Sequence, residues 1–193
     1  MSRLQIPATI ADAPAASQTF LEAINKKLGV TPNLFRLMAN SPAALEGYLS
    51  LAGALAKGEL PVQIGERIAL AVAEINGCDY CMSAHSYLGK NVAKLGEAEM
   101  SANRNGGSND PKAAPAVQFA AKVAHERGHV SDEDLRVIKA AGYTDAQLVE
   151  IVAHIALSVL TNYANVVANT AIDFPVVRTH QHQKNRTRTL LDT

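Results

Sequence analysis

Tryptophan is absent from this chain of 193 residues, aromatic residues make up only 5%, and there are just two cysteines. Neither sign of charge is in excess, because Lys and Arg number 18 and Asp and Glu also number 18. This balance argues against nucleic-acid binding through a global basic field. The first residues contain no long apolar stretch, and the longest apolar run, 151–160, is shorter than the roughly 20 residues that span a bilayer. We therefore expect a soluble, cytoplasmic protein that contacts neither nucleic acid nor a membrane.

Helical periodicity dominates what is present. Hydrophobic residues make up 48% of the chain, and they recur at a spacing near 3.6, whereas the alternation typical of strands is hard to find. Proline follows the expected boundaries at Pro32, Pro42 and Pro61, where it is tolerated at a helix start. The sequence predicts an all-α fold, a helical bundle, with a loop over 102–111. The expected helices are 16–28, 33–39, 43–57, 62–75, 80–95, 112–127, 132–140, 145–160 and 162–170.

The chain is expected to form a single helical domain over residues 1–175, followed by a basic C-terminal tail over 176–193 that is solvated, as termini usually are. Within the domain, the sequence around Glu66 aligns with that around Glu150 at a constant offset. This alignment indicates two related helical-hairpin halves, although two amphipathic helices also match by chance. At this offset the reactive residues of the first half are replaced by asparagines: Cys78 aligns with Asn162, Cys81 with Asn165 and His85 with Asn169.

Both cysteines lie in one Cys-x-x-Cys motif, Cys78 and Cys81, and His85 follows the second by four residues. Asn76 and Gly77 predict the end of one helix, so that a new helix begins with Cys78 at or near its N-cap and Cys81 in its first turn. Free N–H groups and the helix dipole stabilise a thiolate there. Residues four apart share a helix face, so that the imidazole of His85 can take the thiol proton. The pattern favours a redox-active dithiol, in which one cysteine resolves the oxidised sulfur of the other.

Two other interpretations of the motif stay open. Cys78, Cys81 and His85 could supply three ligands to zinc, although the sequence offers no second Cys-x-x-Cys to complete a structural site. Alternatively, both cysteines are buried and inert at a packing face. We expect no metal and no bound cofactor.

An acidic partner for the dithiol is expected on the preceding helix. Glu66 lies twelve residues before Cys78, and its carboxylate reaches the dithiol only if it points inward. Glu74 is the rival, one turn from Cys78, and we expect it to cap the helix or to be solvated.

The remaining histidines carry weaker signals. His154 lies in an apolar helical segment and is expected to be a core histidine, with a place in the same pocket as the alternative. His125 and His129 sit in a helix C-terminal turn that is expected to be solvated. His180 and His182 belong to the predicted tail.

The motif resembles the alkylhydroperoxidase D core of the carboxymuconolactone decarboxylase superfamily, which has Glu, eleven residues, Cys, two residues, Cys, three residues and His. Here these positions are Glu66, Cys78, Cys81 and His85, with every spacing kept. The segments 29–35, 162–165 and 173–175 resemble the peroxidase-related branch of this superfamily, and the likeness covers roughly residues 20–175.

The resemblance implies an alkylhydroperoxidase D-type helical fold, assembly into homo-trimers or homo-hexamers, and reduction of a hydroperoxide by the dithiol. It assigns Cys81 as the peroxidatic thiol, Cys78 as the resolving thiol, His85 as the activating residue and Glu66 as the proton relay. The expected partners are a hydroperoxide substrate and an external dithiol or thioredoxin-like reductant. The best-studied relatives carry histidine where this chain has Tyr80, a poor proton shuttle at neutral pH. A redox-sensing oligomer and a dithiol disulfide oxidoreductase with little peroxidase turnover are the alternatives.

Overall fold

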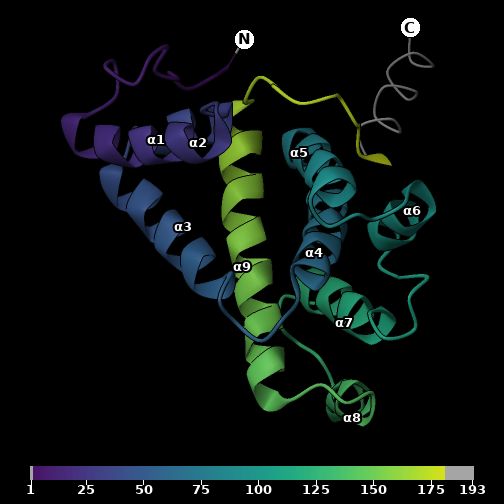
Figure 1. Cartoon of the computed structure of the whole chain (residues 1–193). Helices are drawn as coiled ribbons and strands as arrows, with labels where there is room; N and C mark the ends of the chain where they lie inside the picture. Colours follow the sequence, from purple (N-terminus) through teal and green to yellow (C-terminus); the bar gives the residue numbers. More distant parts are fainter. Residues whose placement is uncertain (1, 181–193) are drawn as a thin grey trace, which may run out of the picture.

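The computed structural model describes residues 2–180, and the secondary structure of this part is wholly helical (Figure 1). The predicted all-α fold is therefore confirmed. The helices are α1 (Ala15–Leu28), α2 (Asn33–Met38), α3 (Pro42–Leu55), α4 (Val62–Ile75), α5 (Asp79–Asn91), α6 (Glu97–Arg104), α7 (Ala114–His125), α8 (Asp132–Ala140) and α9 (Asp145–Ala168).

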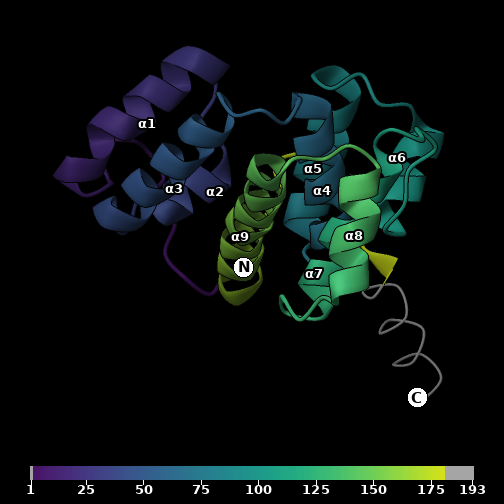
Figure 2. The same ribbon diagram turned by 90° about the horizontal axis from the view of Figure 1, so that it is seen from below.

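The centre of the fold is α4, which contacts α5, α6, α7 and α9 (Figures 1 and 2). Nine of its residues, among them Ile68, Leu70 and Val72, are buried, so that nearly its whole circumference is covered. Its bounds and those of α8 agree with the prediction, because α4 lies between Pro61 and the turn at Gly77, and α8 begins at a capping box on Ser131. The helices α1, α2 and α3 form a separate packing cluster on the other side of α9 (Figure 2).

The long helix α9 corrects the predicted break between 160 and 162. It runs without interruption from Asp145 to Ala168. Neither glycine nor proline lies at the expected boundary, and the Thr161 hydroxyl donates to the carbonyls of Leu157 and Ser158 inside the helix. Between α4 and α5, by contrast, Gly77 adopts a φ of 65° that turns the chain. The second half of the proposed repeat therefore does not form a hairpin at this point.

The helix α6 lies partly in the segment predicted as a loop. Its sequence has no apolar period, and Asn103 is its one buried residue. Polar contacts hold it in place instead: Glu99 accepts a hydrogen bond from Arg67 of α4 at 2.8 Å, and Arg104 donates to Glu74 of α4 at 2.8 Å. Tertiary ion pairing, which local periodicity does not report, therefore explains why the helix was missed.

By length and composition, α9 is apolar enough to cross a membrane, and 39% of the relevant window is buried in the fold. Core helices of globular proteins pass the same test, and here α9 packs against α2, α3, α4, α5 and α7.

The start of the predicted solvated tail is packed rather than free. Val177 exchanges backbone hydrogen bonds with the Ser83 hydroxyl, and Thr179, which is fully buried, donates to Asp79. These contacts seat residues 176–180 on the N-terminal half of α5, because Asp79 and Ser83 offer polar groups one turn apart. The rest of the predicted tail, with His182, lies outside the described residues.

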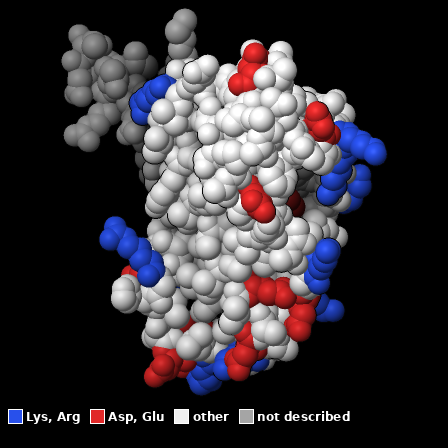
Figure 3. Space-filling view, turned by 90° about the vertical axis from the view of Figure 1, so that its left-hand side faces the viewer, with Lys and Arg blue, Asp and Glu red and all other residues white. Residues whose placement is uncertain are grey.

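Charged side chains are sparse over the middle of the face that α1 and α3 turn outward (Figure 3). Toward the lower end of this face, acidic and basic groups are intermixed rather than segregated. The face therefore presents no continuous basic field.

The ion pair that docks α6 predicts an acid-sensitive stability. Partial burial opposes ionisation of Glu99, but hydrogen bonds from Ser108, Arg67 and their neighbours outweigh it and lower the pKa of Glu99 to about 2. This stabilisation is complete above the unfolded pKa of 4.5 and is lost as the pH falls toward 2. Glu99→Gln should therefore lower the unfolding free energy by about 1–3 kcal/mol at pH 7. The difference from the wild type should shrink below pH 4.5, as measured by urea unfolding at several pH values.

The matched control is Glu97→Gln, because Glu97 lies in the same helix with an exposed side chain. It should leave the stability unchanged. A wild-type advantage over Glu99→Gln that stays constant down to pH 2.5 would contradict the assignment.

Candidate active site

The two cysteines lie where the sequence places them, at the start of α5. Cys78 is the N-cap residue, and its sulfur accepts the backbone N–H of Cys81 at 3.2 Å. The two sulfurs are joined as a disulfide, with Cα atoms 5.3 Å apart, and both residues are at least 98% buried. The expected N-cap geometry is thus present, and the pair appears in its oxidised form. Reduction would leave two thiols at a helix N-terminus, which favours the thiolate.

Two buried asparagines of α9 face the end of α4 and the start of α5. The Nδ2 atom of Asn165 donates to the Cys81 sulfur at 3.4 Å, and Asn162 accepts a hydrogen bond from Asn76 at 2.9 Å. The remaining polar atoms, Oδ1 of Asn165 and Nδ2 of Asn162, are buried and have no hydrogen-bond partner among the described residues. Buried polar atoms without partners are uncommon and often mark functional sites. Asn165 therefore supplies a fixed donor to the sulfur of Cys81.

Glu66 points inward and pairs with His85. Its Oε2 lies 2.9 Å from His85 Nδ1, across the interface of α4 and α5, and both side chains are largely buried. A carboxylate on Nδ1 orients an imidazole and leaves Nε2 for another partner. Among residues 2–180, neither Glu66 nor His85 is hydrogen-bonded to a cysteine sulfur. The carboxylate–imidazole pair and the disulfide are therefore separate units of one site. Cys81 and His85 are nevertheless one helical turn apart on α5.

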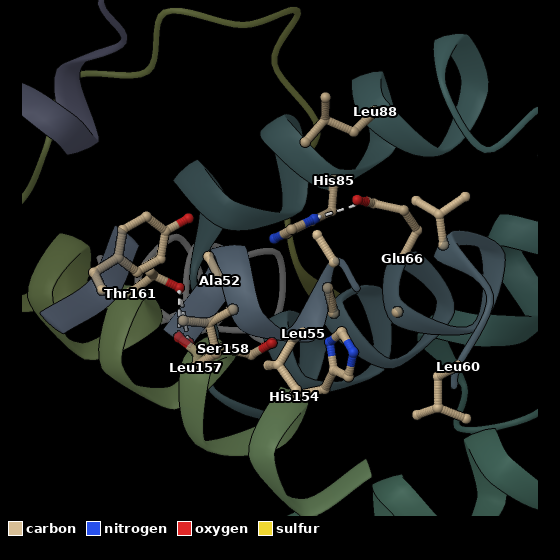
Figure 4. A pocket seen from close by; sticks show the side chains of 15 residues that line it. Ala52, Leu55, Leu60, Glu66, His85, Leu88, His154, Leu157, Ser158 and Thr161 are labelled. Atoms are coloured by element: carbon tan, nitrogen blue, oxygen red, sulfur yellow. Dashed lines mark hydrogen bonds and ion pairs between the residues drawn. The ribbon is translucent and has the colours of Figure 1, made fainter. Parts of the chain in front are cut away.

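The Glu66–His85 pair faces a cavity of about 290 Å³ between α3, α4, α5 and α9 (Figure 4). Its wall is mostly apolar, and His154 lies across from the pair in Figure 4. Tyr48 also lines it, and burial together with the nearby Glu66 charge raises the pKa of Tyr48 to about 12, so that its phenol stays protonated at neutral pH. The other lining residues include Ala52, Leu55, Ala56, Leu60, Ala69, Leu88, Leu157, Ser158 and Thr161.

A second hollow, of about 550 Å³, opens on the Cys78 side of the disulfide. Cys78, Asn165, Arg3 and Arg178 are among the residues that line it, and its wall is more polar than that of the cavity. Arg178 is anchored by Asp79 at 2.9 Å, so that the C-terminal segment forms one edge of the recess. Cys78 therefore borders the polar recess, and His85, which follows the dithiol on α5, borders the apolar cavity.

The sequence-based expectation for Glu74 is wrong. Glu74 is neither a cap nor solvated, because it is buried and accepts hydrogen bonds from Arg104 at 2.8 Å and from the backbone of His180 at 2.6 Å. The hydrogen bonds from Arg104 and His180 explain how the central helix can bury a carboxylate. Glu74 is thus a structural residue.

Tyr80 does not take over the role of the histidine found in relatives. Its hydroxyl accepts the backbone N–H of Leu34 at 3.0 Å, and its ring packs edge-on against Phe174. Burial, the largest influence, raises the pKa of Tyr80 well above its usual value. The side chain ties α5 to α2 and the C-terminal segment, so that this position contributes packing rather than a proton relay.

The remaining histidines of the described part differ in their exposure. His154 lines the cavity, which was the alternative to a core role. His125 and His129 are exposed, as expected. Tyr48 and Asn165 were not selected from the sequence as site residues, although the alignment at constant offset had paired Asn165 with Cys81. Within residues 2–180, no three His, Cys, Asp or Glu side chains are arranged to hold a metal ion.

The chain is similar to known proteins in both sequence and fold. Residues 42–126 match the carboxymuconolactone decarboxylase family, which confirms the resemblance inferred from the motif. A comparison with curated protein sequences finds no match.

Solved structures share the fold. An alkylhydroperoxidase D core protein, peroxidase-related, from Ralstonia eutropha JMP134 superimposes with a TM-score of 0.79 at 24% identity, covering 89% of this chain and 92% of its own. A peroxidase-related protein from Silicibacter sp. TM1040 gives 0.76 at 24% identity, covering 88% and 91%. A variant of the debrominase Bmp8, in complex with 2,3,4-tribromopyrrole, gives 0.73 at 20% identity, covering 90% and 94%. At these identities the likeness establishes the fold.

The contact between Asn165 and Cys81 predicts a shift in thiol acidity. In the reduced protein, Asn165→Leu should raise the pKa of the Cys81 thiol by about 1–2 units, because a hydrogen bond to a charged group is worth about 1.5–3 kcal/mol. The pH dependence of Cys81 alkylation by iodoacetamide, located by mass spectrometry, measures this change. Asn162→Leu is the matched control, since Asn162 bonds to Asn76 and not to sulfur. Superimposable profiles for the wild type and Asn165→Leu would rule out the proposed stabilisation.

Proposed function

We propose that this chain, whose residues 42–126 carry the carboxymuconolactone decarboxylase family match on an alkylhydroperoxidase D-like fold, is a thiol-dependent hydroperoxide reductase with an antioxidant role. The observation that carries the proposal is the pairing of Glu66 with His85 at 2.9 Å, beside a cavity and one helical turn from a Cys-x-x-Cys pair. In this arrangement the carboxylate orients the imidazole, and the imidazole acts as the base. One thiol is the nucleophile, and the other is the resolving group.

The first chemical step takes place at Cys81. In the reduced protein, the imidazole of His85, held through Nδ1 by Glu66, accepts the Cys81 proton directly or through a water in the cavity. The helix N-terminus and the Asn165 amide stabilise the resulting thiolate. The thiolate attacks the terminal oxygen of the hydroperoxide, the O–O bond breaks, and Cys81 becomes a sulfenic acid. The departing alkoxide takes back one proton and leaves as an alcohol.

The second step restores the disulfide. The Cys78 thiol attacks the sulfenic sulfur of Cys81 and expels water, which gives the oxidised pair seen in the structure. An external dithiol, free or on a thioredoxin-like protein, then attacks the disulfide and is itself oxidised. Because Cys78 lines the polar recess, we propose that the reductant approaches from that recess.

Two other functions fit the same dithiol. A redox sensor would form the disulfide slowly and without a saturable peroxide site, whereas a disulfide oxidoreductase would react faster with protein thiols than with peroxide. The mostly apolar cavity beside the Glu66–His85 pair favours a small organic substrate and hence the reductase. The debrominase with this fold binds a small bromopyrrole, so that 2,3,4-tribromopyrrole is a useful competing substrate.

Substitution of the cysteines tests the division of labour. Cys81→Ser should abolish consumption of tert-butyl hydroperoxide, because it removes the attacking sulfur. Cys78→Ser should still consume one equivalent and stop at a sulfenic acid on Cys81, which dimedone traps for mass spectrometry. The wild type should show fast, saturable oxidation.

The proton relay is tested in the same assay. Glu66→Gln should slow oxidation by roughly 10²-fold, the lower part of the range for general acid–base help. Glu46→Gln, at an exposed position of α3, is the control and should react like the wild type. Slow, non-saturating oxidation of the wild type, unaffected by Glu66→Gln, would favour the sensor and refute the reductase.

We also propose that the protein is a homo-oligomer, a trimer or a hexamer. Along α9, exposed apolar side chains at Val149, Val152, Leu160, Tyr163 and Val167 share one face, opposite the face that meets the dithiol. Exposed apolar surface of this extent is typical of protein interfaces.

Light scattering at micromolar concentration should therefore show at least a trimer. A double variant, Val152→Glu with Leu160→Glu, should dissociate it, because two carboxylates would be buried in the contact. Val137→Glu, at an exposed apolar position of α8, should leave the assembly intact. A monomeric wild type would contradict the proposed assembly and leave the thiol chemistry unaffected.

A further inference from the structure

His154 lies in the cavity without a hydrogen-bond partner. Its Nε2 atom is buried, and nothing in the described part of the chain bonds to it. Its ring packs on Gly65 of α4, where an added Cβ would lie only 3.1 Å from Cε1. Glycine inside a helix costs about 0.5–1 kcal/mol relative to alanine. The fold therefore gives up helix stability at Gly65 and leaves room for an imidazole that bonds to no protein group.

The position of His154 relates it to the reacting sulfur. His154, Ser158, Thr161 and Asn165 recur along α9 at intervals of four, three and four, which places them on one face. Asn165 contacts the Cys81 sulfur, whereas the other three line the cavity. Eleven residues at about 1.5 Å each separate the two ends of this polar row by about 16 Å. On α9, Thr161 therefore marks the end of the cavity nearer to the dithiol, one turn before Asn165, and His154 lies toward the other end.

Apart from Ser158 and Thr161, the wall between His154 and the Glu66–His85 pair is mostly apolar. Leu55, Leu60 and Leu157 lie around His154, and Leu88 lies nearer to His85 (Figure 4). Ala69 also lines the cavity. Hydrogen peroxide would leave these carbon surfaces in contact with water and would bring no organic group to His154. A carbon chain of moderate length would cover the wall and bring a second polar group to His154.

We propose that His154 is a specificity residue whose imidazole binds an uncharged hydroxyl or carbonyl group at the far end of an organic hydroperoxide. The inference rests on the proposed function and narrows its substrate to hydroperoxides that carry a second polar group several carbons from the O–O bond. Burial, the largest influence, lowers the pKa of His154, while Glu150 and Glu66 oppose it. A neutral imidazole suits a hydroxyl or carbonyl group better than it suits a carboxylate.

Single-turnover oxidation of the reduced dithiol by two matched peroxides tests the proposal. Wild type should react about 10-fold faster at sub-saturating concentration with 6-hydroxyhexyl hydroperoxide than with hexyl hydroperoxide, as followed by quenched alkylation and mass spectrometry. His154→Phe, which keeps a ring and removes the nitrogen, should bring this ratio close to one. His154→Gln, which keeps a hydrogen-bonding group, should retain part of the preference. An unchanged ratio in His154→Phe would overturn the assignment.

A binding measurement separates this inference from the proposed chemistry. In ¹⁵N-histidine-labelled, oxidised wild-type protein, 1,6-hexanediol should move the Nε2 resonance of His154, whereas 1-hexanol should not. The resonance is identified by its loss in His154→Gln. If the diol moves it and neither peroxide oxidises the wild type, the site stands and the reductase function falls. If both peroxides react and the resonance does not respond, the reductase stands and the role of His154 falls.

Discussion

Burial of ionised side chains on α4 is the constraint on which the rest of the structure depends. The helix lies at the centre of the fold and still carries Glu66, Arg67 and Glu74 with little exposure. Unpaired charges there would be strongly destabilising, so that each must meet a partner from another element. Glu66 meets His85 of α5, and Arg67 and Glu74 meet residues of α6. The pairing of these charges therefore holds α5 and α6 against α4. Because the cysteines lie at the start of α5, the same pairing also positions the dithiol.

The disulfide occupies the junction of these elements. Cys78 borders the polar recess, and His85, one turn beyond Cys81 on α5, borders the cavity. In the proposed function, the organic substrate occupies the cavity and the reductant reaches the disulfide from the recess. The C-terminal segment contributes through its bonds to Asp79 and Ser83, which seat it on the first turns of α5.

The elements whose signals are local could be predicted, and those held by distant partners could not. The bounds of α4 and α8 follow from the proline, glycine and capping residues at their ends. The polar helix α6 was missed because its stability comes from ion pairs with α4, and the break predicted in α9 was wrong because nothing local interrupts that helix. Glu74 was misjudged for the same reason, since its partners Arg104 and His180 are 30 and 106 residues away.

The sequence by itself determined the all-helical class and the placement of Cys78 at an N-cap with Cys81 in the first turn, because hydrophobic period and helix capping are properties of short segments. The motif spacing also singled out Glu66 and His85. Only the tertiary structure decided that Glu66, rather than Glu74, turns toward His85 and that Asn165 contacts the Cys81 sulfur. It also decided that His154 faces the cavity. These relations join different helices, and the rotation of one helix against another depends on packing and on the pairing of buried charges across the whole chain.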